Sequence, residues 1–198
     1  MTLRAPPPNA VAAGIVLTLL AACATRPPAP RPSWPARLAT LRALPHFDLS
    51  GRIAVSTGAD GFSAGMRWSQ QDTDATIDLL APLGFGAAHI ELHGEQLKIT
   101  TSRGERLERE AATAELASML GFEPPLASLR YWMLGASDPA TAAEETLDLQ
   151  QRLVHLVQDG WRIDYADYAQ VRGQWLPRRL TVQREPLRLR LVIESWRL

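Results

Sequence analysis

The sequence contains very little cysteine and lysine, and it has no excess charge of either sign. Among its 198 residues Cys23 is the single cysteine, so an intramolecular disulfide and a metal site built from several cysteines are both excluded. The 21 basic residues balance the 21 acidic ones, and every basic residue except Lys98 is an arginine. This balance lacks the basic excess of nucleic-acid-binding domains, and no nucleic-acid partner is predicted. A composition of 46% apolar and 21% charged residues is typical of one or two globular domains.

Long hydrophobic runs are also scarce. The apolar stretch at residues 11–20 has half of the roughly 20 residues that a membrane-spanning helix needs. It follows Arg4 and precedes small residues, which is the order of a secretory signal peptide. Leu20-Ala21-Ala22-Cys23 resembles the lipobox of bacterial lipoproteins, whose cysteine receives a diacylglyceryl group before cleavage. We therefore expect a signal peptide at 1–22 and lipid attachment at Cys23; the alternative is an ordinary signal peptide followed by an unmodified cysteine.

The segment after the cysteine is rich in proline. Five prolines among residues 24–36 are incompatible with a helix or a central strand, so residues 23–37 are predicted to form a lipidated, extended tether. Ala24 stands where enterobacterial-type lipoproteins retained in the inner membrane carry aspartate. That resemblance implies a destination on the periplasmic face of the outer membrane. Three acyl chains would hold the protein there stably, whereas a single chain anchors only reversibly.

From Phe47 onward, apolar and polar residues alternate with a period of two, which predicts antiparallel strands with one apolar face. Three short helices interrupt or precede the strands: one within 35–44, one at 114–120 capped by Thr113, and one after Pro125 that ends at Gly135. Residues 136–148 are small and acidic and are predicted to form a surface loop. The fold class is α+β, with about ten to eleven strands and short helices.

The apolar face of so long a sheet is larger than two small helices fill. The sheet is therefore expected to curl into an incomplete barrel, with the helices across its opening. Trp68, Leu79 and Leu191 are candidates for the lining of an enclosed cavity. The pattern does not distinguish a ligand cavity from a filled core, and close packing, the general rule for protein interiors, favours the filled core.

Motifs for chemistry lack the context that they need. Gly61-Phe62-Ser63-Ala64-Gly65 matches the Gly-x-Ser-x-Gly nucleophile pattern, which requires a sharp strand-to-helix turn, but it lies inside an alternating strand with Ser63 facing outward. His89, Glu91 and His93 share one strand face, and without a fourth ligand they are predicted to be solvated. No catalytic residue, metal or cofactor is predicted. A periplasmic hydrolase using Ser63 is kept as a third hypothesis.

Pro82-Leu83-Gly84 places a leucine between a residue with fixed φ and one that tolerates positive φ. A leucine at a hairpin tip exposes its side chain, and about 1.5–3 kcal/mol is gained when that side chain leaves water. The tripeptide therefore indicates insertion into a membrane or a partner. A leucine folded back onto the core is the alternative, and without other observations it is the better interpretation.

Several segments, in this order, resemble the LolB family of outer-membrane lipoproteins. The segments are Leu-Ser-Gly-Arg-Ile-Ala-Val at 49–55, Phe-Ser-Ala-Gly-Met-Arg-Trp at 62–68, Pro-Leu-Gly at 82–84, Pro-Leu-Ala-Ser-Leu-Arg-Tyr-Trp-Met-Leu-Gly at 125–135, Gln-Asp-Gly-Trp-Arg-Ile-Asp-Tyr at 158–165 and Arg-Leu-Arg-Leu-Val-Ile-Glu-Ser-Trp at 188–196. The resemblance covers residues 38–198 as one lipid-binding domain and continues into the lipobox.

This resemblance implies a fold and a function. The fold is an unclosed antiparallel β-barrel, covered by helices, with an apolar cavity for acyl chains. The function is a monomeric receptor, anchored in the outer membrane, that accepts lipoprotein cargo from a periplasmic LolA-like carrier and inserts it into the membrane lipid. The alternative is a structural or assembly lipoprotein with a filled core. The resemblance assigns membrane insertion to Pro82, Leu83 and Gly84, and the candidates for the acyl-chain cavity are Trp68, Ile77, Leu79, Trp132 and Leu191.

The role of Leu83 is open to a direct test. Replacing Leu83 with glutamate places a charge at the tip and removes the gain from membrane insertion. We expect the variant to receive cargo normally but to fail in releasing it into membranes, measured as transfer of a lipoprotein from the receptor to vesicles. Normal release by the variant contradicts the tip assignment.

Overall fold

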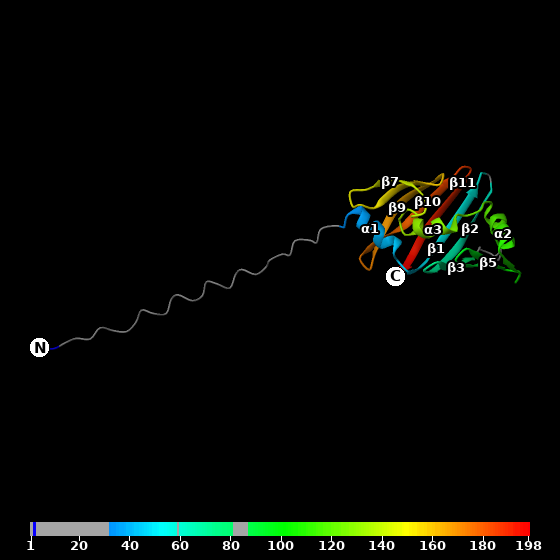
Figure 1. The fold of residues 1–198 in the computed structure, drawn as a ribbon, viewed down its shortest axis with the longest axis horizontal. Helices are drawn as coiled ribbons and strands as arrows, with labels where there is room; N and C mark the ends of the chain where they lie inside the picture. Colours follow the sequence, from blue (N-terminus) through cyan, green and yellow to red (C-terminus); the bar gives the residue numbers. More distant parts are fainter. Residues whose placement is uncertain (1, 3–31, 59, 81–86) are drawn as a thin grey trace. The chain divides into compact units, whose positions relative to one another are not determined.

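The period-two segments form one antiparallel sheet of eleven strands within the part of the chain that the structure describes (Figure 1). The structure is a computed structural model that describes residues 2, 32–58, 60–80 and 87–198. Cys23 and Pro82-Leu83-Gly84 lie outside these residues. The strands are β1 (His46–Thr57), β2 (Asp60–Gln71), β3 (Asp74–Leu80), β4 (Ala87–His93), β5 (Gln96–Thr101), β6 (Arg106–Glu108), β7 (Ala143–Leu147), β8 (Leu153–Gln158), β9 (Trp161–Val171), β10 (Gln174–Arg184) and β11 (Leu187–Arg197).

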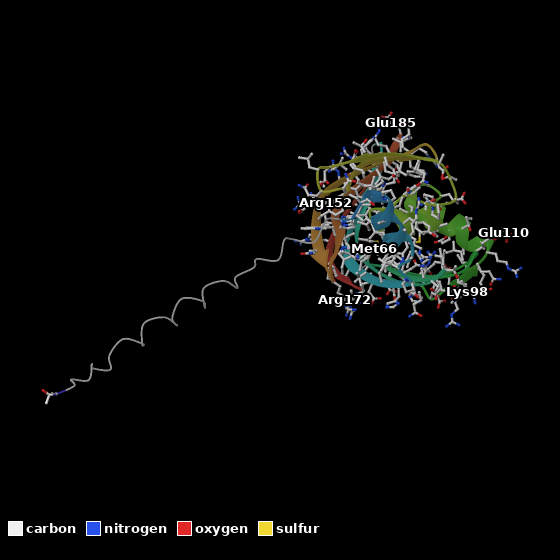
Figure 2. The ribbon with its side chains drawn as sticks, turned by 60° about the vertical axis from the view of Figure 1, so that its left-hand side comes forward. Met66, Lys98, Glu110, Arg152, Arg172 and Glu185 are labelled. Carbon is white, nitrogen blue, oxygen red and sulfur yellow. The ribbon has the colours of Figure 1, made fainter. Side chains whose placement is uncertain are left out.

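The strand order shows why the sheet stays open. It runs β6-β5-β4-β3-β2-β1-β11-β10-β9-β8-β7, so the first and last strands pair in the middle and join two meanders. The edges are β6 and β7, which pair only with β5 and β8. Figure 2 shows the sheet curving around the helices. The predicted α+β fold with an unclosed antiparallel barrel is confirmed.

Alternation along the strands places one set of side chains inside the curve. In β1, Phe47, Leu49, Gly51, Ile53 and Val55 are buried, while the residues that alternate with them are exposed or half-buried. The same alternation continues through the long strands on both sides of β1. Residues from Pro32 to Leu198 form one compact unit that contains the whole sheet and its core. This unit therefore contains everything that its fold requires.

Three helices accompany the sheet: α1 (Trp34–Arg42), α2 (Glu110–Leu120) and α3 (Leu126–Met133). Helix α2 packs against β5 and β6, and α3 approaches β10. Helix α1 begins inside the segment predicted as tether, because a proline at its first turn suits a helix start and Trp34 and Arg37 are buried. None of the helices in the described residues has the length and apolar character needed to cross a membrane.

The segment predicted as a surface loop at 136–148 contains an additional strand, β7. It pairs with β8 from Ala143 opposite Gln158 to Leu147 opposite Leu153. Its sequence, Ala-Glu-Glu-Thr-Leu, lacks the apolar alternation of the other strands, because an edge strand is held by backbone pairing on one side and carries polar side chains outward. The prediction of a loop was therefore wrong for residues 143–147.

Gly51 is required at the irregular point in the pairing of β1 with β11. The register of the two strands shifts between Ser50 and Gly51, and a Cβ atom at Gly51 would collide with the Val192 carbonyl oxygen and lie 2.9 Å from the Cα of Ile193. Both obstacles are backbone atoms of a central strand. An added methyl group has no room there without displacing β11.

We expect Gly51→Ala to lower the free energy of unfolding by about 2–3 kcal/mol, measured by urea denaturation of residues 32–198. Gly65→Ala is the matched control in the neighbouring strand, where the nearest atom to the added Cβ lies 3.7 Å away. Equal stability of the two variants would show that the pairing of β1 with β11 tolerates a side chain at position 51.

Candidate functional site: an apolar cavity beneath two helices

A cavity lies between the inner face of the sheet and the segment that contains α2 and α3. Its volume is about 40 Å³. Every residue that lines it is apolar. The sheet contributes Ile53, Met66, Trp68, Ile77, Leu79, Ile90, Leu189 and Leu191, and the covering segment contributes Leu116, Leu120, Phe122, Pro124, Leu126, Leu129 and Met133. Such a lining offers no hydrogen bond to water and matches the chemistry of hydrocarbon.

The cavity is small in this conformation. A water molecule requires about 10–15 Å³ by this kind of measure, so the space corresponds to only a few waters. Sites for small molecules usually measure roughly 300–1,000 Å³. An acyl chain of a lipoprotein therefore does not fit until the covering segment moves away from the sheet. The structure lies between the two sequence-based alternatives, because the core is nearly filled but contains a dry hollow.

The sheet residues predicted for the cavity are brought together. Trp68, Ile77, Leu79 and Leu191 come from β2, β3 and β11, and all four line the hollow. The indole nitrogen of Trp68 donates to the Gln70 side-chain oxygen at 2.9 Å, which satisfies its polar atom away from the cavity. The structure gives these side chains the predicted location, and their contact with acyl chains stays a prediction.

Trp132 does not line the cavity. It is fully buried on α3, where its indole nitrogen donates to the Gln158 side-chain oxygen at 2.9 Å and its ring lies 6.1 Å from that of Trp161. Leu129 and Met133 of the same helix face the cavity. Helical periodicity places all three residues on a buried surface of α3, but that surface is wide enough to contact two different parts of the sheet.

Several lining residues were not predicted from the sequence. Leu116 and Leu120 are four positions apart on α2, which is the spacing of one helix face. Phe122 and Pro124 belong to the connection between α2 and α3, and no periodic signal marks them. The inner parity of β1, β2, β4 and β11 identified Ile53, Met66, Ile90 and Leu189 as buried without indicating which of them meet the hollow.

Polar contacts fix α3 to its surroundings. Besides the bond from Trp132 to Gln158, Ser128 donates to Asp138 at 2.7 Å, and Arg130 donates to the Leu44 carbonyl at 3.2 Å. The Tyr165 hydroxyl of β9 donates to the Trp132 carbonyl at 3.0 Å. Burial raises the pKa of Tyr165 well above its usual value, so the hydroxyl keeps its proton. Four contacts of this kind hold α3 in one place.

Helix α2 has no comparable attachment. In the described structure, residues 110–124 form hydrogen bonds only within the segment Arg109–Leu126, and none of their side chains forms a hydrogen bond or an ion pair. Burial of Ala112, Leu116 and Leu120 holds the helix on the sheet. The polar link between α2 and the sheet lies at the N-cap, where the Arg109 amide donates to the Leu97 carbonyl of β5 at 2.9 Å. Beyond this point the helix is held by apolar contacts, which have no preferred direction.

The sequence motifs that resemble a catalytic serine or a metal site do not have the surroundings that such sites require. Ser63 is exposed within β2, opposite Ala54, and is not at a strand-to-helix turn. His89 and His93 each pair with an aspartate of β3, at 2.7 Å from Asp78 and 3.1 Å from Asp74. In the described part of the chain, no three such side chains are arranged to hold a metal ion.

Comparison with known proteins shows to which family this chain belongs. The family model described as LolB, outer membrane lipoprotein LolB, matches residues 45–196. The chain belongs to the LolB family. It is 36% identical over 190 residues to the outer-membrane lipoprotein LolB of Alkalilimnicola ehrlichii, covering 94% of this chain and 95% of that one. The LolB of Nitrosococcus oceani is 35% identical over 190 residues, covering 92% and 94% of the two chains.

Solved structures with the same fold are distant in sequence from this LolB family member. A LolA superfamily protein from Nitrosomonas europaea superimposes with a TM-score of 0.55 at 8% identity, covering 84% of this chain and 94% of that one. A DUF1329 family protein from Desulfovibrio piger gives a TM-score of 0.56 at 6% identity, with coverage of 83% and 90%. At such identities the likeness concerns the fold alone.

The difference between α2 and α3 predicts a difference in hydrogen exchange. We expect the amides of α2 to exchange through local opening at a lower free energy than those of α3, because only the side chains of α3 form hydrogen bonds with the surrounding structure. Native-state hydrogen exchange measured on peptides from residues 110–120 and 126–133 checks this. Equal protection of the two helices would contradict the independent movement of α2.

Proposed function

We propose that this protein is a membrane-anchored acceptor for lipoproteins, which takes their acyl chains into the cavity beneath α2 and α3 and passes them to the outer membrane. The observation that carries the proposal is the entirely apolar lining of that cavity. Membership of the LolB family and the names of the relatives support the same role. No covalent chemistry is part of it.

The energetics favour opening of the cavity by cargo. A sixteen-carbon chain releases on the order of 10 kcal/mol when it leaves water. Detaching α2 exposes Leu116 and Leu120, and each costs about 1.5–3 kcal/mol. One acyl chain therefore more than offsets the displacement of α2. Without cargo the same leucines close the hollow, which keeps water out.

Movement of α2 defines where a chain enters. Helix α3 and its contacts with Asp138, Gln158 and Tyr165 form the fixed side of the cavity. Displacement of α2 from β5 and β6 opens the other side, along the edge of the sheet. The chain then lies along Ile77, Leu79 and Leu191.

The segments outside the described residues complete the proposal. Lipid at Cys23 anchors the protein in the outer membrane, and the residues between Cys23 and α1 connect the anchor to the domain on the periplasmic side. The protein acts as a monomer that docks with a LolA-like carrier, so that chains pass between the cavities without meeting water. An affinity difference of about 1.4 kcal/mol between carrier and acceptor gives a tenfold bias toward the acceptor. Pro82-Leu83-Gly84 then brings the cargo into the membrane.

Fatty-acid uptake tests the cavity. We expect saturable binding of a fluorescent sixteen-carbon fatty acid to residues 32–198. Leu79→Gln should weaken it about tenfold or more, because an unpaired amide then faces the chain. Leu80→Gln is the matched control, since Leu79 lines the cavity while Leu80, the next residue of β3, is 67% exposed. Binding is measured by fluorescence titration, and thermal unfolding verifies that both variants fold.

Absence of saturable uptake by the unsubstituted domain would favour the alternative, a structural or assembly lipoprotein with a filled core. Equal binding by both variants would place the fatty acid outside the cavity. Transfer of a labelled lipoprotein from a LolA-like carrier to the anchored protein tests the acceptor step itself.

A further inference from the structure

The outer face of the central strands carries a concentration of arginines although the chain as a whole is neutral. We define the basic face as Arg52 of β1, Arg179 of β10, and Arg188 and Arg190 of β11. All four side chains are exposed and point away from the cavity, because their neighbours at alternating positions are buried. The cavity and the basic face are therefore opposite surfaces of the same strands.

Strand register brings these arginines together. Val192 of β11 lies opposite Arg52 on one side and opposite Arg179 on the other. Arg190 is the next outward residue along β11, so it is a diagonal neighbour of both, at roughly 7–8 Å. Arg188 follows in the same direction. The result is a continuous charged surface across three adjacent strands.

Acidic partners neutralise only part of this surface. Arg52 pairs with Glu194 at 2.9 Å, and Arg179 lies 4.0 Å from Asp167. Among the side chains that the structure describes, none forms an ion pair with Arg188 or Arg190. In the register row of Arg190, Thr181 of β10 lies between Arg190 and Asp164 of β9. Asp164 instead contacts His155 at 2.7 Å. The face keeps a net positive charge.

The position of the basic face connects it with the proposed insertion segment. One register row runs across five strands, from Leu80 through Gly65, Arg52 and Val192 to Arg179. Leu80 is 67% and Val192 40% exposed, so the row combines apolar and cationic side chains. Leu80 is also the last residue of β3 before the segment that contains Leu83.

We propose that the basic face binds the anionic headgroups of a phospholipid membrane and lays the outer surface of the sheet against it. The choice of membrane as the occupant rests on the proposed function, in which the domain is tethered to a bilayer and Leu83 enters it. The four arginines are spread over the outer surface of three adjacent strands and are not gathered in a pocket, so each cation is free to contact a separate headgroup. The cavity on the opposite surface stays free to receive cargo.

Vesicle binding by residues 32–198 tests this inference. The probe is phosphatidylcholine vesicles containing phosphatidylglycerol at about one part in three, compared with phosphatidylcholine alone. We expect binding to the anionic vesicles that weakens in high salt, and a loss of roughly thirtyfold, equivalent to about 2 kcal/mol, in the double variant Arg188→Ser, Arg190→Ser. Cosedimentation gives the partition constants.

The matched control is Arg172→Ser, Arg197→Ser, which removes the same charge at the other end of the sheet. Arg172 lies in the turn between β9 and β10, and Arg197 pairs with Asp48 at the start of β1. Figure 2 shows Arg172 on the side of the domain opposite Glu185, which lies in the β10–β11 hairpin. We expect less than a threefold change for this control.

Two results would overturn the inference. One is an equal loss of binding in the two double variants. The other is unchanged vesicle binding by Arg188→Ser, Arg190→Ser, which would assign the face to an acidic protein if transfer from a LolA-like carrier is weaker in that variant. Fatty-acid uptake by the same variants separates this inference from the proposed function. Failure of uptake removes the acceptor role, whereas failure of vesicle binding removes only the membrane contact of the basic face.

Discussion

The interaction on which this structure depends is the contact between the inner face of an open sheet and two short helices. A sheet whose edges β6 and β7 do not pair with each other has an apolar inner surface that water would otherwise reach. Helices α2 and α3 and the connection between them cover that surface with leucine, phenylalanine, proline and methionine side chains and leave an apolar hollow of about 40 Å³. The contact that closes the core also borders the hollow, so the proposed uptake of a ligand depends on displacing α2.

Helices α2 and α3 are held in place by different kinds of interaction. Directional hydrogen bonds from Ser128, Arg130 and Trp132 hold α3 in one position. Non-directional apolar burial holds α2, and a hydrocarbon ligand is able to replace it with contacts of the same nature. The polar atoms of the domain therefore define what stays fixed, and the exclusively apolar region defines what is able to open.

The two faces of the central strands have different chemistry. Alternation in β1 and β11 points Ile53 and Leu191 into the cavity, and Arg52 and Arg190 outward. In our proposals the inner face receives acyl chains and the outer face meets anionic headgroups. A single strand pair then contributes to both surfaces through alternate residues.

The alternation of residues predicted the long antiparallel strands and their inner parity, because backbone periodicity is local, and glycine and proline signals located α2 and α3. Helix α2 nevertheless begins at Glu110 and not after Thr113. Strand β7 escaped prediction, since an edge strand with polar side chains depends on its pairing with β8. The different surroundings of Trp132 and Met133 were equally hidden, because neighbours on one helix meet different parts of a curved sheet. The sequence by itself thus determined which side chains of the long strands are buried. Only the tertiary structure decided which of them meet empty space, because a cavity arises from side chains that are distant in the chain and fail to fill the volume between them.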